Sequence, residues 1–106
     1  MEDKVKTVLA ELRRELQKLY GGRLHELILF GSQARGEADP DSDIDVAVIL
    51  DGEINYYEEV ERTGELRSDL CIEHGLLVSL VYLEEKVYQE NQWPITMNIH
   101  AEGIAL

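Results

Sequence analysis

The sequence predicts an α+β (mixed α/β) fold, in which helices pack on a small sheet of about three to four strands. Three observations support this prediction. A chain of 106 residues with 44% hydrophobic residues suits a single globular domain spanning 1–106. Short apolar runs that end at glycine alternate with stretches of helical period. No repeat, linker or low-complexity segment divides the chain, so no domain boundary is predicted.

The first half of the chain predicts one helix and two buried strands. Apolar residues recur every three or four positions over residues 5–19, which is typical of an amphipathic helix, and Gly21-Gly22 ends it. The apolar run 27–30 predicts a strand. Residues 31–42, GSQARGEADPDS, predict a loop or a loop with a short helix. The β-branched run 44–50 predicts a second strand.

The second half predicts a helix, a strand and two shorter helices. Residues 54–74 have the spacing of a helix, and residues 76–83 form a third apolar run. Residues 84–91 are polar and predict a helix. Pro94 is placed to open a final short helix, which Gly103 ends. The resulting order of elements is typical of a small sheet with helices packed on it.

Charge and composition exclude several classes of partner. Ten basic residues against 22 acidic residues give a net charge of −12, which disfavours bulk nucleic-acid binding and anionic membrane surfaces. No apolar run approaches the roughly 20 residues of a membrane span. The N-terminus has no signal-peptide pattern. The lone Cys71 cannot form an internal disulfide, so we expect a reducing, cytoplasmic location.

Asp43 and Asp45 form the first candidate site. Residues two apart on a strand point to the same face, so these carboxylates should lie together at the start of the second strand. Neighbouring carboxylates repel each other, and a divalent cation with oxygen ligands, such as Mg²⁺, would offset that repulsion. The alternative is an ordinary solvated strand end, which would be the better interpretation for an isolated Asp-x-Asp.

Gly31-Ser32 and Arg35 form the second candidate site. Glycine lets backbone N–H groups approach an anion, and the serine hydroxyl adds a donor. In isolation, Gly31-Ser32 would more simply be a tight turn. Arg35 is the one basic residue between Arg23 and Arg62, and it either pairs with a neighbouring aspartate or binds a phosphate.

Taken together, GSQARG followed by SDIDVAV resembles the minimal nucleotidyltransferase domain of the DNA polymerase beta superfamily. Ten residues separate Gly31-Ser32 from Asp43, and Asp45 follows two positions later. The C-terminal NIHAEGIAL is also similar to the ending of that branch, so the resemblance covers nearly the whole chain. Antitoxins paired with HEPN-domain toxins belong to this branch, which implies a nucleotidyltransferase-fold sheet here.

The resemblance implies a role for each site residue. Asp43 and Asp45 would be catalytic and would bind Mg²⁺. Four residues would bind ATP or another nucleoside triphosphate: Gly31, Ser32, Arg35 and Ser42. The reaction would transfer AMP to a hydroxyl of a partner HEPN toxin, within a homo- or hetero-oligomer.

Ser79 departs from the family pattern. The family's third carboxylate lies on the next strand, where this chain has Leu77-Val78-Ser79-Leu80-Val81. Serine is a weak metal ligand and is not a general base near neutral pH. The alternative to an enzyme is therefore a catalytically degenerate antitoxin that neutralises its partner by contact.

Two further groups of residues are expected to be structural. Most of the later aromatic residues are expected to be buried or half-buried in packing, with an exposed subset as a partner surface: Tyr56, Tyr57, Tyr82, Tyr88 and Trp93. A run of glutamates is expected to be a solvated helix face, or else a surface for a basic partner: Glu53, Glu58, Glu59, Glu61 and Glu65.

Overall fold

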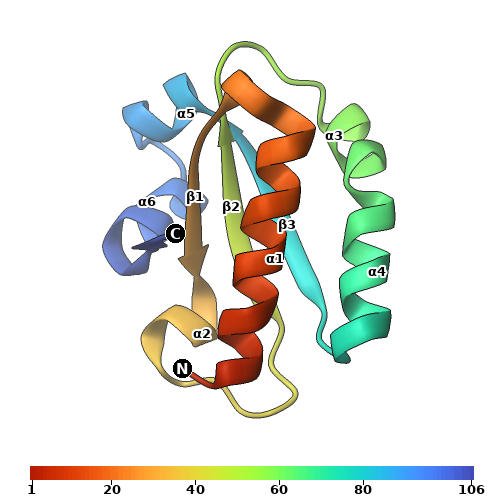
Figure 1. The fold of residues 1–106 in the computed structure, drawn as a ribbon. Coiled ribbons are helices and arrows are strands. Elements are labelled where there is room, and N and C mark those ends of the chain that lie inside the picture. Colours follow the sequence, from red (N-terminus) through yellow and green to blue (C-terminus); the bar gives the residue numbers. More distant parts are fainter.

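A four-stranded mixed sheet organises the molecule (Figure 1). The computed structural model describes residues 1–106. The strands are β1 (Leu24–Phe30), β2 (Ile44–Leu50), β3 (Val78–Glu84) and β4 (Ile104–Ala105). Their spatial order is β3-β2-β1-β4, with β1 antiparallel to β2 and β4, and β2 parallel to β3. The predicted α+β class and strand number are confirmed.

Six α-helices surround this sheet. They are α1 (Asp3–Tyr20), α2 (Gly31–Arg35), α3 (Tyr56–Arg62), α4 (Gly64–His74), α5 (Glu85–Glu90) and α6 (Pro94–Glu102), with a 3-10 turn, η1 (Gly21–Arg23), after α1. Parallel strands need a crossover connection, and α3 and α4 supply it between β2 and β3. None of the helices has the length and apolar character needed to cross a membrane.

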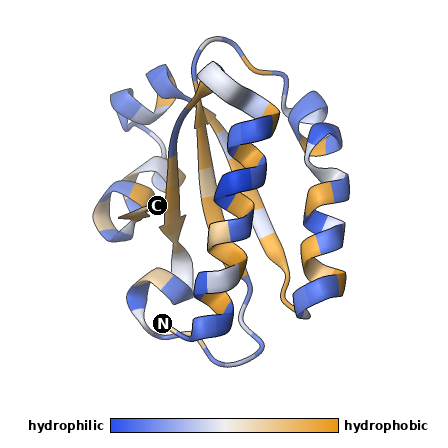
Figure 2. Ribbon diagram, in the orientation of Figure 1, coloured by the Kyte–Doolittle hydropathy of each residue, from blue (hydrophilic) through white to orange (hydrophobic).

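The larger hydrophobic core lies between the sheet and the helices α1 and α4. Leu12 and Leu16 of α1 and Val46 and Val48 of β2 are completely buried there. Burial of each such side chain contributes about 1.5–3 kcal/mol. Figure 2 shows the apolar strands behind helices whose outer sides are hydrophilic. The core therefore anchors β2, the strand that begins beside the predicted acidic pair.

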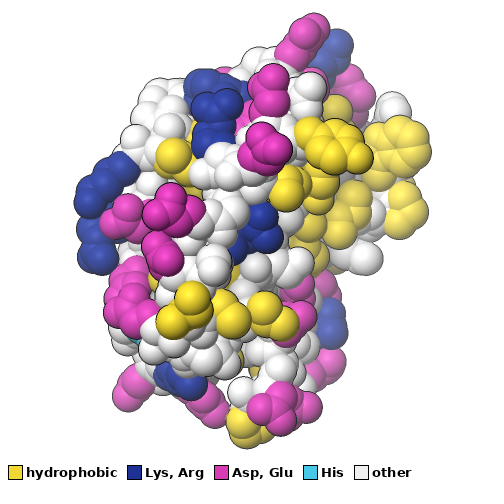
Figure 3. Space-filling model, turned by 90° about the vertical axis from the view of Figure 1, so that its right-hand side faces the viewer, with side chains coloured by type: hydrophobic (Ala, Val, Ile, Leu, Met, Phe, Trp, Pro, Cys, Tyr) yellow, Lys and Arg dark blue, Asp and Glu magenta, His cyan; other side chains and the backbone are white.

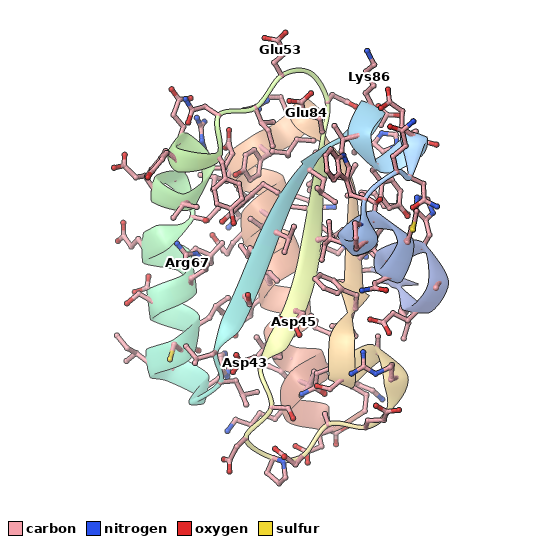
Figure 4. The ribbon with its side chains drawn as sticks, turned by 180° about the vertical axis from the view of Figure 1, so that it is seen from behind. Asp43, Asp45, Glu53, Arg67, Glu84 and Lys86 are labelled. Carbon is pink, nitrogen blue, oxygen red and sulfur yellow. The ribbon has the colours of Figure 1, made fainter.

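The opposite face of the sheet is only partly covered. Its smaller core consists of Ile28, Phe30, Ala47, Ile49, Tyr88 and Ile99. Figure 4 views this face and shows α5 and α6 on the side of β1, with no helix in front of the first residues of β2 and β3. The start of β2 is consequently open to solvent on this face.

The segment 54–74 forms two helices where the sequence predicted one. Thr63 lies between α3 and α4 with a ψ of 0°, and its hydroxyl donates to the carbonyl of Glu59 at 2.9 Å. The same hydroxyl is hydrogen-bonded to the hydroxyl of Tyr82 on β3. Apolar spacing continues through the break, with Leu66 and Leu70 packing on the core, which is why periodicity missed it.

The end of the chain adds a strand that was not predicted. After Gly103, the two-residue β4 pairs with β1 at Ile28 and Leu29. Two residues are too short to show a strand pattern in the sequence. The third strand also begins at Val78, two residues later than predicted.

Glu59 is an exception to the expected solvated acidic face, and the expectation is wrong for this residue. Its side chain is 1% exposed and accepts a hydrogen bond from the Tyr20 hydroxyl at 2.9 Å. Arg23 and Arg62 form ion pairs with it at 3.6 and 3.1 Å. Burial and the Glu59 carboxylate raise the pKa of Tyr20. The other four glutamates of the run are exposed.

The aromatic residues are less buried than predicted. Tyr82 and Tyr88 lie in the two cores, but Tyr56, Tyr57 and Trp93 are 54%, 83% and 61% exposed. The expectation that most of these five are buried or half-buried is therefore wrong. Figure 3 shows the side of the molecule formed by α3 and α4, where hydrophobic and acidic side chains lie next to each other.

Candidate functional site

Asp43 and Asp45 lie at the start of β2, on the open face of the sheet (Figure 4). Asp45 pairs in register with Phe30 on β1 and with Ser79 on β3, so these three residues share one face. Asp43 is exposed and Asp45 is half-buried. Burial, and then the charge of Asp43, raise the pKa of Asp45 above its ordinary value, while Arg35 opposes the rise.

Two carboxylates of this kind fit a divalent cation. The raised pKa shows that the ionised form of Asp45 lacks a sufficient positive partner within the chain. Carboxylate oxygens are the ligands that Mg²⁺ prefers, and no helix covers this end of the face in Figure 4. The geometry is thus consistent with the predicted metal ligands Asp43 and Asp45.

Gly31 is placed directly against Asp45. It follows the last residue of β1 with a φ of +75°, a conformation that favours glycine. A Cβ atom at this position would overlap the Asp45 carboxylate. Glycine is therefore required both for the backbone turn and for the close approach of the chain to the acidic pair.

Ser32 and Ser42 occupy different positions relative to this turn. Ser32 is half-buried in α2, and its hydroxyl makes no hydrogen bond within the chain. Ser42 lies in the loop before β2, where its hydroxyl accepts a hydrogen bond from the Asp39 backbone N–H at 3.0 Å. Ser32 therefore has an unused hydroxyl donor one residue after the Gly31 turn, whereas Ser42 shapes the loop.

Arg35 binds two glutamates and not a neighbouring aspartate, which was one of the two alternatives that the sequence left open. Its Nε donates to Glu37 at 3.0 Å, and its Nη1 donates to both oxygens of Glu102 at 3.2 and 3.0 Å. Glu102 also accepts a hydrogen bond from the Gly31 N–H at 3.1 Å. No local pattern predicted Glu102, because its partners lie 67 and 71 positions away.

Ser79 lies where a third carboxylate would complete the site. It is exposed and stands opposite Asp45 in the register of the parallel strands. Figure 4 shows Glu84 at the far end of β3, well away from Asp43 and Asp45. Glu84 therefore does not take the place of the missing acid.

A groove of about 410 Å³ lies along the edge strand β3, between it and the helices α3 and α4. Asp43 and Ser79 line it at one end, and Tyr56, Tyr82 and Arg67 line it farther along. A larger groove of about 550 Å³ lies between α1 and the helices α3 and α4. The smaller groove reaches one residue of the acidic pair, Asp43, and the larger groove reaches neither.

Two histidines lie in acidic groups that are separate from Asp43 and Asp45. Two groups each bring a histidine and two carboxylates together: Glu11, Glu73 and His74, and His25, Asp51 and Glu85. In each group the histidine already contacts carboxylates, with distances of 3.1 Å for His74–Glu11 and 3.3 Å for His25–Glu85. Neither group includes the acidic pair.

Comparison with known proteins identifies relatives along most of the chain. Residues 9–106 match the nucleotidyltransferase domain family. A putative protein adenylyltransferase of Methanocaldococcus jannaschii is 28% identical over 99 residues, covering 92% of this chain and 93% of that protein. The protein adenylyltransferase MntA of Thermococcus cleftensis is 32% identical over 94 residues, covering 81% of this chain and 93% of MntA.

Solved structures share the fold. A toxin–antitoxin complex with AMP-PNP contains a chain that superposes with a TM-score of 0.66 at 22% identity, covering 91% of this chain and 69% of that one. A putative nucleotidyltransferase from Sulfolobus solfataricus gives a TM-score of 0.58 at 18% identity, covering 99% of this chain and 86% of the other. At these identities, the likeness is evidence for the fold alone.

Proposed function

Because the chain belongs to the nucleotidyltransferase domain family, we propose that it transfers AMP from ATP to a hydroxyl of a partner protein. The partner that we propose is a HEPN-domain toxin, which the chain neutralises as an antitoxin. Residues 1–106 would act as one minimal domain in the cytoplasm, in a complex with this partner. The observation that carries the proposal is the acidic pair, Asp43 and Asp45, held against the Gly31 turn.

The relatives support the chemistry in this proposal. Two of them are named as protein adenylyltransferases, and a structural neighbour is a toxin–antitoxin complex with AMP-PNP. A single small domain with an open site also suits a protein substrate, because a partner can complete the site.

Asp43 and Asp45 would hold Mg²⁺ on the open face. When bound, Mg²⁺ would supply positive charge to the triphosphate and to the attacking and leaving oxygens. The chain's own contribution is mainly positioning and charge stabilisation. Gly31 keeps the backbone close to Asp45, the Ser32 hydroxyl is free to donate to a phosphate, and Arg35 adds a positive charge.

The transfer step forms one bond and breaks another. The acceptor hydroxyl oxygen attacks the α-phosphorus of ATP, the bond between the α-phosphorus and its bridging oxygen breaks, and pyrophosphate leaves. The hydroxyl proton passes to water or to a base of the partner, because Ser79 cannot accept it near neutral pH. The resulting product is an AMP phosphodiester on the partner.

Ser79 favours a second candidate function. Without a third carboxylate, the chain could neutralise its partner by contact alone, with nucleotide binding retained or lost. Exposed Tyr56 and Tyr57, next to acidic residues on α3, would suit a basic partner surface in that case.

A labelling experiment distinguishes the two functions. The chain and the protein encoded beside it are incubated with Mg²⁺ and ATP labelled at the α-phosphate. We expect label on the partner, and we expect that Asp43→Ala combined with Asp45→Ala removes it. Glu53→Ala is the control, because Glu53 is exposed at the far end of the sheet (Figure 4). Neutralisation without label, unchanged in the double variant, would support the contact function instead.

A further inference from the structure

Glu102 joins the end of α6 to both ends of α2, which lie about 70 positions earlier in the sequence. Its Oε1 accepts from the Gly31 N–H at 3.1 Å and from Arg35 Nη1 at 3.2 Å, and its Oε2 accepts from Arg35 Nη1 at 3.0 Å. Arg35 and the Gly31 N–H hold the pKa of Glu102 below its ordinary value. The carboxylate is therefore ionised and engaged on both of its oxygens.

The fold fixes Glu102 from both sides. It is the last residue of α6, and β4 begins two residues later against β1. Between them, the Gly103 N–H donates to the Ile99 carbonyl at 2.8 Å. A Cβ atom on Gly103 would overlap Ile28 of β1, so helix and strand meet at close range. The Glu102 side chain is 24% exposed and lies where α6 meets the paired strands β4 and β1.

Arg35 is thereby held with part of its guanidinium free. Glu37 takes the Nε donor and Glu102 takes the Nη1 donor, while Nη2 makes no hydrogen bond or ion pair. A guanidinium presents five N–H donors in one plane, so fixing two of its nitrogens also fixes the direction of the third. The positive charge of Arg35 is close enough to Asp45 to oppose the rise in the pKa of that carboxyl.

We propose that Glu102 is a positioning residue for nucleotide binding. It orients Arg35 so that Nη2 meets a phosphate of the nucleotide that Asp43 and Asp45 bind with the metal, and it fixes the Gly31 turn beside them. This inference rests on the proposed function. It differs from an arrangement in which Glu102 merely fills an anion site that the nucleotide must empty, because that arrangement predicts tighter binding once Glu102 is removed.

The test measures MgATP binding to the full chain by calorimetry. Glu102→Ala is expected to weaken binding roughly tenfold or more, since both charge-assisted hydrogen bonds from Arg35 Nη1 are lost. Glu102→Gln keeps an oxygen acceptor for Gly31 and Arg35, so we expect a loss of only about threefold. The Arg35 Nη1 hydrogens should exchange faster with water in Glu102→Ala, because they lose their acceptor, and this change reports the release of that end of the guanidinium.

Two control variants separate positioning from general damage. Glu90→Ala removes an exposed acid without an ion pair and should leave binding unchanged. Ile99→Val lowers the stability of α6 without altering the Glu102 side chain, and it should lower the melting temperature but not MgATP affinity.

Each outcome decides the inference. Weaker binding in Glu102→Ala, partial recovery in Glu102→Gln and unchanged affinity in Ile99→Val would support it. Unchanged or tighter binding in Glu102→Ala would overturn it while leaving the proposed function intact. A wild-type chain that binds no MgATP would overturn the proposed function, and this inference with it.

Discussion

Asp45, a proposed metal ligand, lowers the folding stability of the protein in its ionised form. Its pKa is raised by burial and by Asp43, so the folded state binds the proton more tightly than the unfolded state does. Ionisation therefore lowers the free energy of unfolding as the pH rises from the unfolded pKa through the higher folded pKa, and the loss persists at neutral pH. A group arranged in this way is typical of a ligand-binding position.

Replacing this carboxylate should stabilise the protein. Asp45→Asn is expected to raise the melting temperature by about 2–5 °C near pH 7, and the gain should vanish near pH 3, where Asp45 is protonated. Thermal unfolding followed by circular dichroism at both pH values measures this. Asp69→Asn, an exposed acid on α4 with no ion pair, is the matched control. Equal melting temperatures for wild type and Asp45→Asn near pH 7 would contradict the interpretation.

Two glycines with nearly the same positive φ allow the cost of backbone strain to be separated from the cost of a side-chain overlap. Gly31 and Gly36 have φ values of +75° and +73°, but only Gly31 lies against another side chain, that of Asp45. Gly36→Ala should cost about 1 kcal/mol through its positive φ alone. Gly31→Ala should cost roughly 1–3 kcal/mol more and should also abolish AMP transfer. Urea unfolding of both variants measures the difference, and equal costs would count against the close approach of Gly31 to Asp45.

At the scale of elements, a buried hydroxyl pair joins the α3–α4 junction to the sheet. Thr63 is completely buried, and its hydroxyl is hydrogen-bonded to that of Tyr82 on β3. Thr63→Val keeps the shape but leaves the Tyr82 hydroxyl without this partner, which should cost about 1–3 kcal/mol.

A double-mutant cycle tests this pair. Tyr82→Phe in the Thr63→Val background should cost little further, because both polar groups are then absent. The coupling energy from urea unfolding should be favourable by about 1 kcal/mol. If the two single changes were simply additive, the junction would be held by packing alone.

Most elements could be predicted from the sequence because their apolar spacing is local. The period of α1 and the β-branched run of β2 each reflect burial on one or both faces, and both elements were confirmed. The break at Thr63 could not be predicted, because it depends on a hydroxyl of β3. Strand β4 could not be predicted either, because its pairing with β1 gives no pattern in two residues.

The candidate site was predictable only in part, for the same reason. Asp43, Asp45 and Gly31 come from neighbouring segments, so their proximity follows from one antiparallel strand pair. Glu102 reaches Arg35 only through the packing of α6 and β4 on β1, which no local pattern contains. The buried position of Glu59 was hidden likewise, since its charge is balanced by Arg23 from a different segment.

At the scale of the whole molecule, the net charge of −12 opposes compactness. Raising NaCl from about 20 mM to about 300 mM should screen this repulsion and raise the melting temperature by roughly 3–8 °C. A variant carrying Glu58→Lys and Glu90→Lys, two exposed positions, should have a higher melting temperature at low salt. Its melting temperature should rise less when NaCl is added. Similar salt responses in both proteins would show that the excess charge does not limit stability.

The contact between Arg35 and Glu102 also sets an order of events during biosynthesis. The two residues are 67 positions apart, so at about 5–20 residues per second a ribosome makes Glu102 roughly 3–13 s after Arg35. Strand pairing takes microseconds once the residues are free of the ribosome. The antiparallel pair bearing Asp43 and Asp45 can thus form early, while Arg35 still awaits the carboxylate that orients it. A nascent chain would gain its acidic pair first and its ordered arginine last.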